Sequence, residues 1–245
     1  PTVESNLVDL IDLMKTGEYD VGLAFDGDAD RVGVVDEKGD ILWADQLMSI
    51  FLPDIIKDGE DILFDVKCSQ ALEDMIQRYG GNPIMWKTGH SLIKQKMSEL
   101  GCKFGGEMSG HIFFADDYYG YDDALYVGAR LLQLLSRTEK SLSELRSDIP
   151  VYYSTPEMRM EAKNDEEKFT ITKKAIDYFT NNYDCITVDG VRIQFGDGWG
   201  LVRSSNTQPV IVCRFEANSV ERKNEIMNLV LTKLKEFGDL ELGGH

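Results

Sequence analysis

The sequence contains few cysteines and few histidines, and this scarcity excludes several common kinds of site. Its four cysteines, Cys68, Cys102, Cys185 and Cys213, include no Cys-x-x-Cys pair. Neither a thiolate zinc site nor a disulfide framework is therefore indicated, and we expect free thiols in a reducing compartment. No apolar run approaches the length of a membrane span, and no signal-peptide pattern is recognised. We expect a cytoplasmic protein with no membrane partner.

Basic side chains are also scarce. The 245 residues include 26 Lys and Arg against 43 Asp and Glu, which gives a formal net charge of -17 at pH 7. Phosphate backbones require basic surfaces, so we expect no nucleic-acid partner. An anionic substrate would need a local cationic pocket. The chain is long enough for one large domain or two ordinary domains with real cores.

The first part of the chain alternates between strand and helix patterns. Such alternation is typical of an α/β layer with a mostly parallel sheet. The expected elements are a helix at 4–15, a buried strand "DVGLAF", a hairpin of "RVGVVD" and "DILWAD", a helix at 46–57, a strand "DILFDV", a helix from the Ser69 cap to Tyr79, a strand "PIMWKT", a helix capped by Ser91 and stopped by Gly101, and a helix at 122–137.

After Asp148-Ile149-Pro150 the order of elements changes. We expect a strand at 152–160, a helix at 165–181, short strands in "ITVDGVRIQF", "WGLVRSS" and "PVIVCRFEA", and a closing helix at 220–237. The predicted fold is therefore a mixed-sheet α/β domain followed by a smaller α+β C-terminal domain. The predicted boundary lies near residues 147–150.

Residues 26–31, which we call the aspartate loop, place Asp26, Asp28 and Asp30 within "FDGDADR". Like charges at this range repel one another, so a positive partner is expected there. A divalent cation with oxygen ligands is the simplest partner, and Mg²⁺ would keep positions for water or a phosphate oxygen. Gly27 and Ala29 are expected to act as small spacers that let the loop curl.

Three other interpretations of the aspartate loop remain open on these residues alone. In the EF-hand template Glu37 would fall at the twelfth position, but the sixth position is Arg31 instead of glycine and the flanks are strands. Phosphatases of the haloacid dehalogenase class place an Asp-x-Asp pair after a strand. Asp26 would then be the nucleophile, although Asp30 stands where threonine or valine is usual. A purely structural acidic turn is the third interpretation.

Residues 105–111, "GGEMSGH", form a second polar loop, which we call the Glu107 loop. Glu107 can accept hydrogen bonds from two adjacent hydroxyls of a sugar, and Ser109 adds a donor and acceptor. Gly105, Gly106 and Gly110 would permit close approach of a ligand to the backbone. The alternative is a glycine-rich turn before a strand.

Residues 203–209, "RSSNTQP", form a third polar loop, the Arg203 loop. A guanidinium, hydroxyls, an amide and backbone N–H groups in one turn make a dense donor array for a phosphate dianion. The alternative is a polar turn between strands. The predicted phosphate ligands are Arg203, Ser205, Asn206 and Thr207, with Ser204 as a weaker candidate.

These three loops occur in an order that resembles the α-D-phosphohexomutases, the family of phosphoglucomutase and phosphomannomutase. In that family the matching stretches are the metal-binding, sugar-recognition and phosphate-binding loops, and "DVKC" and "WKTGHS" also resemble family stretches. Met108 and Asn206 resemble the bacterial phosphomannomutase/phosphoglucomutase type. Phosphoglucosamine mutases, which usually carry glutamine and glycine there, remain an alternative.

The resemblance implies roles for individual residues. His90 would help move the proton of a sugar hydroxyl, Lys67 would balance phosphate charge, and Arg31 would join the catalytic set. His111 would lie beside the sugar or its phosphate. The family reaction passes a phosphoryl group from a phosphoserine to a hexose phosphate through a bisphosphorylated sugar, with Mg²⁺ as cofactor.

The resemblance covers only the C-terminal half of the family, and the phosphoserine motif is not found. Residues 1–35 would end domain 2, 36–147 would form domain 3, 150–240 would form domain 4, and 241–245 would be a possible tag remnant. The intact protein would interconvert the 6- and 1-phosphates of mannose or glucose, and the fragment alone would be inactive. A non-catalytic metal or sugar-phosphate binding module is a further alternative.

Overall fold

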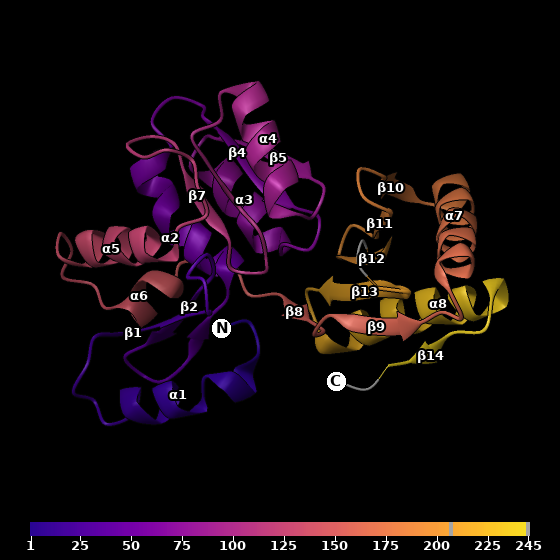
Figure 1. The fold of residues 1–245 in the computed structure, drawn as a ribbon, viewed down its shortest axis with the longest axis horizontal. Coiled ribbons are helices and arrows are strands. Elements are labelled where there is room, and N and C mark those ends of the chain that lie inside the picture. Colours follow the sequence, from indigo (N-terminus) through magenta and orange to yellow (C-terminus); the bar gives the residue numbers. More distant parts are fainter. Residues whose placement is uncertain (206–207, 244–245) are drawn as a thin grey trace. The chain divides into compact units, whose positions relative to one another are not determined.

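The computed structural model describes residues 1–205 and 208–243. The chain divides into two compact units, Pro1–Pro150 and Val151–His245, called here the first and second unit (Figure 1). Each unit builds its own sheets and its own helices, so each is described separately.

The first unit begins with a small antiparallel sheet that carries the aspartate loop. After η1 (Glu4–Asn6) and α1 (Val8–Met14) come β1 (Val21–Phe25), β2 (Val32–Asp36) and β3 (Ile41–Leu42). The strand order is β1-β2-β3, and β2 and β3 form the predicted hairpin. The expectation of a buried strand at β1 is wrong, because β1 lies at the edge of this sheet and only its Gly22 is buried.

A second sheet in the first unit has the order β5-β4-β6-β7. It consists of β4 (Asp61–Asp65), β5 (Asn82–Trp86), β6 (Phe104–Gly106) and β7 (Ile112–Phe114). The central strand β4 pairs in parallel with β5 and β6, whereas β7 runs antiparallel to β6. The sheet is therefore mixed, as predicted.

Helices cover both faces of this mixed sheet. Leu63 packs against Ile93 and Met97 of α4 (His90–Leu100). On the other face, the ring of Phe51 in α2 (Ala44–Ile55) lies 5.1 Å from that of Phe114. The remaining helices of the unit are α3 (Gln70–Arg78), α5 (Ala124–Leu135) and α6 (Leu142–Arg146).

Three helix ends of the first unit test the expectations from sequence. The Ser69 side chain accepts a hydrogen bond from the Ala71 N–H and caps α3, as predicted, and Gly101 ends α4 in the left-handed conformation with φ 67°. The prediction that Ser91 caps α4 is wrong. The N-cap is Gly89, whose φ of 136° is rarely adopted by residues with a side chain. Helix α6 was not expected.

The second unit is an antiparallel sheet with two long helices. Its strands are β8 (Tyr153–Ser154), β9 (Met158–Glu161), β10 (Asp184–Ile186), β11 (Val191–Gln194), β12 (Gly198–Ser204), β13 (Val210–Ala217) and β14 (Glu241–Leu242), and its helices are α7 (Asp165–Asn182) and α8 (Val220–Phe237). The single strand expected at 152–160 is in fact β8 and β9. Within the segment 241–245, β14 pairs with β9, and His245 lies outside the described residues.

One face of the second sheet packs against both helices. Alternate residues of β13, namely Ile211, Cys213 and Phe215, share one buried cluster with residues of α7 and α8 such as Phe179 and Val230. This one-helix, several-strands, one-helix arrangement matches the predicted smaller α+β domain. Within the described residues, no helix is long and apolar enough to cross a membrane.

Candidate functional site

The carboxyl ends of three neighbouring strands bring polar residues to one edge of the mixed sheet. Strand β4 ends at Asp65, β5 is followed by His90 at the start of α4, and β6 is followed by Glu107. Asp65 pairs in register with Trp86, and the preceding Phe64 pairs with Gly106, so these strand ends are aligned. Ligands of open α/β sheets bind at this edge.

Asp65 holds this edge together, although sequence reasoning did not select it. Its carboxylate is fully buried and accepts hydrogen bonds from the Met108 N–H at 3.1 Å and from the Thr88 hydroxyl at 3.0 Å. The predicted catalytic residue Lys67 is also mostly buried, with Nζ 3.8 Å from Asp65 Oδ2. The sequence signals for Asp65 were its position near the end of a predicted strand and its place at the start of the stretch "DVKC".

Glu107 is buried, and both of its carboxylate oxygens contact protein groups. One oxygen accepts from the Gly89 N–H, and the other accepts from the Ser109 hydroxyl at 3.3 Å and lies 3.2 Å from His111 Nδ1. Burial alone would raise the pKa of Glu107, but the His111 ring and the Gly89 N–H outweigh it and lower the pKa. The carboxylate is therefore ionised at neutral pH and fixes the start of α4.

His111 connects the Glu107 loop to the aspartate loop. Its Nδ1 faces Glu107, and its Nε2 lies 3.2 Å from Asp30 Oδ2. Burial would lower the pKa of His111, but the carboxylates of Glu107, Asp30 and Asp122 raise it. Gly110 adds a backbone contact next to the aspartate loop, because its carbonyl accepts from the N–H of Val32, the first residue of β2, at 3.2 Å.

The glycines of the Glu107 loop are explained by backbone conformation and by close packing inside the protein. Gly110 has a φ of 96°, which favours glycine. A Cβ on Gly105 would lie 2.8 Å from the carbonyl oxygen of Leu63, and one on Gly106 would lie 2.7 Å from the sulfur of Met48. The expectation that Gly105 and Gly106 make room for a ligand is therefore wrong, since both sit in β6 against neighbouring atoms.

The aspartate loop is organised around Asp26. One carboxylate oxygen accepts from the N–H groups of Asp30 at 3.2 Å and Arg31 at 3.1 Å, and the other accepts from Arg31 Nε at 2.5 Å. Burial would raise the pKa of Asp26, but the bonds from Arg31 lower it to about 2. The left-handed residue of the loop is Ala29, with φ 58°, and not Gly27. A non-glycine residue with positive φ is uncommon and often marks a functional loop.

The donor set of the aspartate loop fits a divalent cation. One carboxylate oxygen from each of Asp26, Asp28 and Asp30 lies within 4.8 Å of the other two. Arg31 contacts the Asp26 carboxylate and His111 contacts that of Asp30, whereas Asp28 is exposed. Carboxylate oxygens are the ligands that Mg²⁺ and Ca²⁺ prefer.

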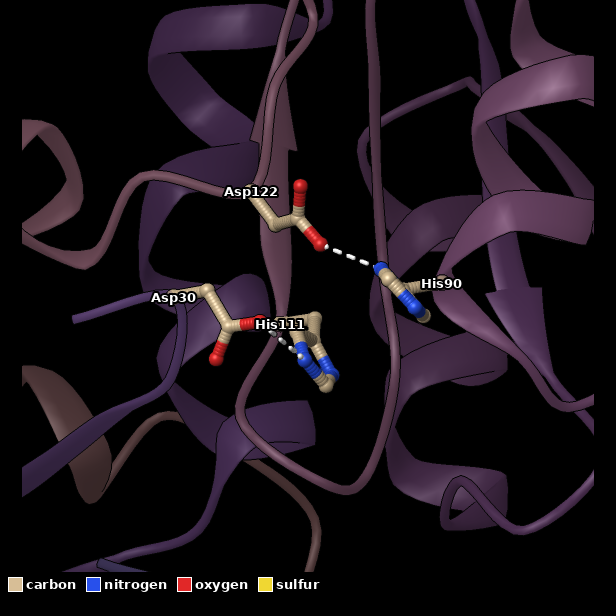
Figure 2. Close-up of side chains that lie close together, drawn as sticks. All are labelled: Asp30, His90, His111 and Asp122. Atoms are coloured by element: carbon tan, nitrogen blue, oxygen red, sulfur yellow. Dashed lines mark hydrogen bonds and ion pairs between the residues drawn. The ribbon is translucent and has the colours of Figure 1, made fainter. Parts of the chain in front are cut away.

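His90 lies next to His111, at the start of α4 (Figure 2). The two rings stack with centroids 5.1 Å apart. His90 Nδ1 is 2.7 Å from one oxygen of Asp122, and Lys94 Nζ is 2.7 Å from the other. Burial would raise the pKa of Asp122, but Lys94 and His90 lower it. Sequence reasoning treated residue 122 only as a helix start, so Asp122 was missed as a site residue.

The Arg203 loop follows β12 in the second unit, and the structure gives several of its residues internal partners. Arg203 is buried and its Nε donates to Asp189 Oδ2 at 2.9 Å, while the Ser204 hydroxyl donates to Thr172 at 2.8 Å. The Ser205 N–H donates to the Val210 carbonyl at 2.9 Å. The predicted ligands Asn206 and Thr207 lie outside the described residues.

Lys168 of α7 supports the same loop and was not found from sequence. Its side chain is only 3% exposed. Nζ donates to the carbonyl of Ser205 at 3.0 Å, to that of Gln208 at 2.9 Å and to Asp165 at 2.6 Å. Lys168 therefore hydrogen-bonds to the Arg203 loop on both sides of residues 206–207.

Comparison with known proteins identifies the fold and the family. Models for phosphoglucomutase/phosphomannomutase match the chain in three consecutive segments: alpha/beta/alpha domain II over residues 1–39, alpha/beta/alpha domain III over 43–153 and the C-terminal domain over 157–233. The chain belongs to the phosphoglucomutase/phosphomannomutase family. The resemblance carried by the sequence motifs is thereby confirmed.

Individual relatives agree with this assignment. A phosphomannomutase/phosphoglucomutase from Pseudomonas putida is 46% identical over 241 residues, which cover 96% of this chain and 51% of that protein. A phosphoglucomutase from Neisseria gonorrhoeae is 42% identical over 93% of this chain and 50% of its own length. A crystal structure of a family protein from Burkholderia thailandensis aligns with a TM-score of 0.84 and 40% identity, over 96% of this chain and 51% of that one. The chain thus spans about half the length of these relatives.

Proposed function

We propose that this chain is the C-terminal part of a phosphohexomutase that moves a phosphoryl group between C6 and C1 of a hexose phosphate. The observation that carries the proposal is the pair of contacts made by His111, which joins Asp30 of the aspartate loop to Glu107. A loop suited to a cation and a loop suited to sugar hydroxyls are thereby linked in one unit. The names of the relatives in Pseudomonas and Neisseria support mannose and glucose phosphates as substrates.

The proposed roles follow from the chemistry of each group. His90 directs Nδ1 toward Asp122, so its other ring nitrogen is available to exchange a proton with a substrate hydroxyl. Sugar hydroxyls would be bound by Glu107, Ser109 and His111, through the lone pairs and donor hydrogens that these side chains do not use in bonds to the protein. Lys67 and Arg31 would add positive charge to this edge.

We also propose Mg²⁺ as the cation of the aspartate loop, held by Asp26, Asp28 and Asp30. When bound, Mg²⁺ supplies positive charge that offsets the charge of a transferring phosphoryl group. Residues 203–207 of the Arg203 loop would bind a substrate phosphate. Under this proposal residues 1–35, 36–147 and 150–240 correspond to the end of domain 2, to domain 3 and to domain 4.

A phosphatase with Asp26 as its nucleophile is a less suitable function for this site. Both Asp26 oxygens are already engaged, one by two backbone N–H groups and the other by the Arg31 guanidinium. A carboxylate held in this way is stabilised as an anion and is a poorer nucleophile. The aspartate loop is better suited to holding a cation.

Assays of two proteins test the proposal. The chain extended by its own upstream sequence should convert both glucose 1-phosphate and mannose 1-phosphate to the 6-phosphates, and the 245-residue chain alone should convert neither. Hydrolysis of these esters by the short chain, lost in Asp26→Asn, would instead establish the phosphatase.

For the cation, Mg²⁺ affinity measured by calorimetry should fall in Asp28→Ala/Asp30→Ala. Equal affinity in the two proteins would refute the assigned ligands.

A further inference from the structure

Four side chains from four separate segments converge beside the aspartate loop (Figure 2). Asp30 belongs to that loop, His90 begins α4, His111 precedes β7, and Asp122 precedes α5. One ligand atom from each residue lies within 4.8 Å of the other three. Two of the pairs are already close, with His90 Nδ1 to Asp122 Oδ2 at 2.7 Å and His111 Nε2 to Asp30 Oδ2 at 3.2 Å.

The chemistry of this group differs from that of the aspartate loop. Two imidazoles with two carboxylates suit Zn²⁺ and similar transition metals, whereas Mg²⁺ prefers oxygen ligands alone. In a tetrahedral zinc site, metal–ligand bonds of about 2.0–2.1 Å place neighbouring ligand atoms roughly 3.4 Å apart. The two close pairs, at 2.7 and 3.2 Å, are both shorter than that spacing and would have to open slightly. The wider pairs need to close by about 1 Å or somewhat more, which small side-chain rotations can supply.

Outer partners already orient the prospective ligands. His111 Nδ1 lies 2.9 Å from the Ser109 hydroxyl and 3.2 Å from Glu107, so Nε2 is the nitrogen left for a metal. Lys94 holds one oxygen of Asp122 and leaves the other beside His90. Such partners fix the tautomer and direction of metal ligands.

We propose that Asp30, His90, His111 and Asp122 form a second cation site, which binds Zn²⁺ or a related transition-metal ion. The His90 side chain is 50% exposed and the other three are more buried, so an ion can enter from solvent on the His90 side. Each imidazole binds through its lone pair and releases any proton on that nitrogen to solvent. The ion occupies the two histidines of the proposed sugar site, so it acts as an inhibitor there.

Zinc binding by the 245-residue chain tests the site without reference to activity. Zn²⁺ is titrated against a chromophoric chelator in millimolar Mg²⁺, which competes for the aspartate loop, because Asp30 belongs to both groups of residues. We expect one Zn²⁺ per chain, with affinity reduced about 10-fold or more in His90→Ala, which loses an imidazole ligand, and in Asp122→Asn, which replaces a carboxylate ligand by a neutral amide. Asp28→Asn, which changes only the aspartate loop, is the matched control and should alter the affinity less than about 3-fold. Cys185→Ser and His245→Ala should have equally little effect.

Two results would overturn the proposal. If His90→Ala and Asp122→Asn bind Zn²⁺ as tightly as the unchanged chain, the four residues are not the ligands. If Asp28→Asn alone removes binding, Zn²⁺ occupies the aspartate loop. Inhibition of the extended protein by Zn²⁺ is a separate measurement that rests on the proposed function, and absence of mutase activity would leave the binding result intact. Circular dichroism of each variant establishes that it is folded.

Discussion

Replacing Lys168 by methionine tests how the Arg203 loop is held in place. Methionine keeps the length of the side chain but removes the ammonium that donates to the carbonyls of Ser205 and Gln208. A buried polar group that loses its partner costs about 1–3 kcal/mol. The bond to Asp165 adds little, because Asp165 is 69% exposed and such pairs contribute ~0–1 kcal/mol. We therefore expect a loss of about 2–4 kcal/mol in the free energy of unfolding of the second unit.

Calorimetric melting of the 245-residue chain measures this loss. For a domain of this size each 1 kcal/mol lowers Tm by roughly 4–8 °C, so a fall on the order of 10 °C or more is expected. Lys173→Met is the matched control, because Lys173 lies on the same helix and is exposed. Asp165→Asn should also lower Tm only slightly, which separates the carbonyl contacts from the ion pair.

The same variant tests whether the loop binds phosphate as proposed. Inorganic phosphate binding, followed by ³¹P NMR below the melting temperature, should weaken in Lys168→Met and not in Lys173→Met. A Tm for Lys168→Met equal to that of Lys173→Met would show that the two carbonyl contacts do not stabilise the unit. Unchanged phosphate binding would show that Lys168 does not position a phosphate site.

Three further predictions concern single residues. Burial would raise the pKa of Glu37, but hydrogen bonds from Ser143 and its neighbours lower it to about 2. Glu37→Gln should therefore lower the free energy of unfolding by about 1–2 kcal/mol at pH 7. Urea titrations should show this difference disappear as the pH falls from ~4.5 to ~2. Gly110→Ala places alanine at an unfavourable φ and puts its Cβ 2.9 Å from the carbonyl oxygen of Val32. The free energy of unfolding should therefore fall by about 1–3 kcal/mol, and Tm should fall with it. An unchanged Tm would contradict this. Burial raises the pKa of the Cys213 thiol to about 12, so a thiol reagent should modify it only at the rate of unfolding, and rapid modification of the native chain would contradict this.

Local signals in the sequence were sufficient for most of the fold. Helix α8 has the predicted bounds, and α7 ends one residue beyond them, because long helices carry a sustained apolar period and clear caps. Errors arose where tertiary context decides. Ser91 has the side chain of a helix cap, but the chain begins α4 earlier because Gly89 adopts its unusual φ while its N–H donates to Glu107.

Burial and strand order were the harder features to predict. The apolar sequence of β1 is typical of a central strand, yet this strand lies at the edge of the β1-β2-β3 sheet. An apolar run specifies which residues can be buried, but the neighbours that bury them come from distant segments. For the same reason, the close packing around Gly105 and Gly106 could not be distinguished from space for a ligand.

Asp65 and Asp122 show why the candidate site was only partly predictable. The aspartate, Glu107 and Arg203 loops each concentrate several polar groups in a few residues, so each stands out in the sequence. Asp65 and Asp122 belong to none of these loops, and their partners, among them Met108 for Asp65 and His90 for Asp122, come from other segments. Their contacts exist only after the strands of the mixed sheet have been placed side by side. Because Asp65 is fully buried at the end of β4, its replacement should disturb Thr88 and the Glu107 loop together, although neither adjoins it in the sequence.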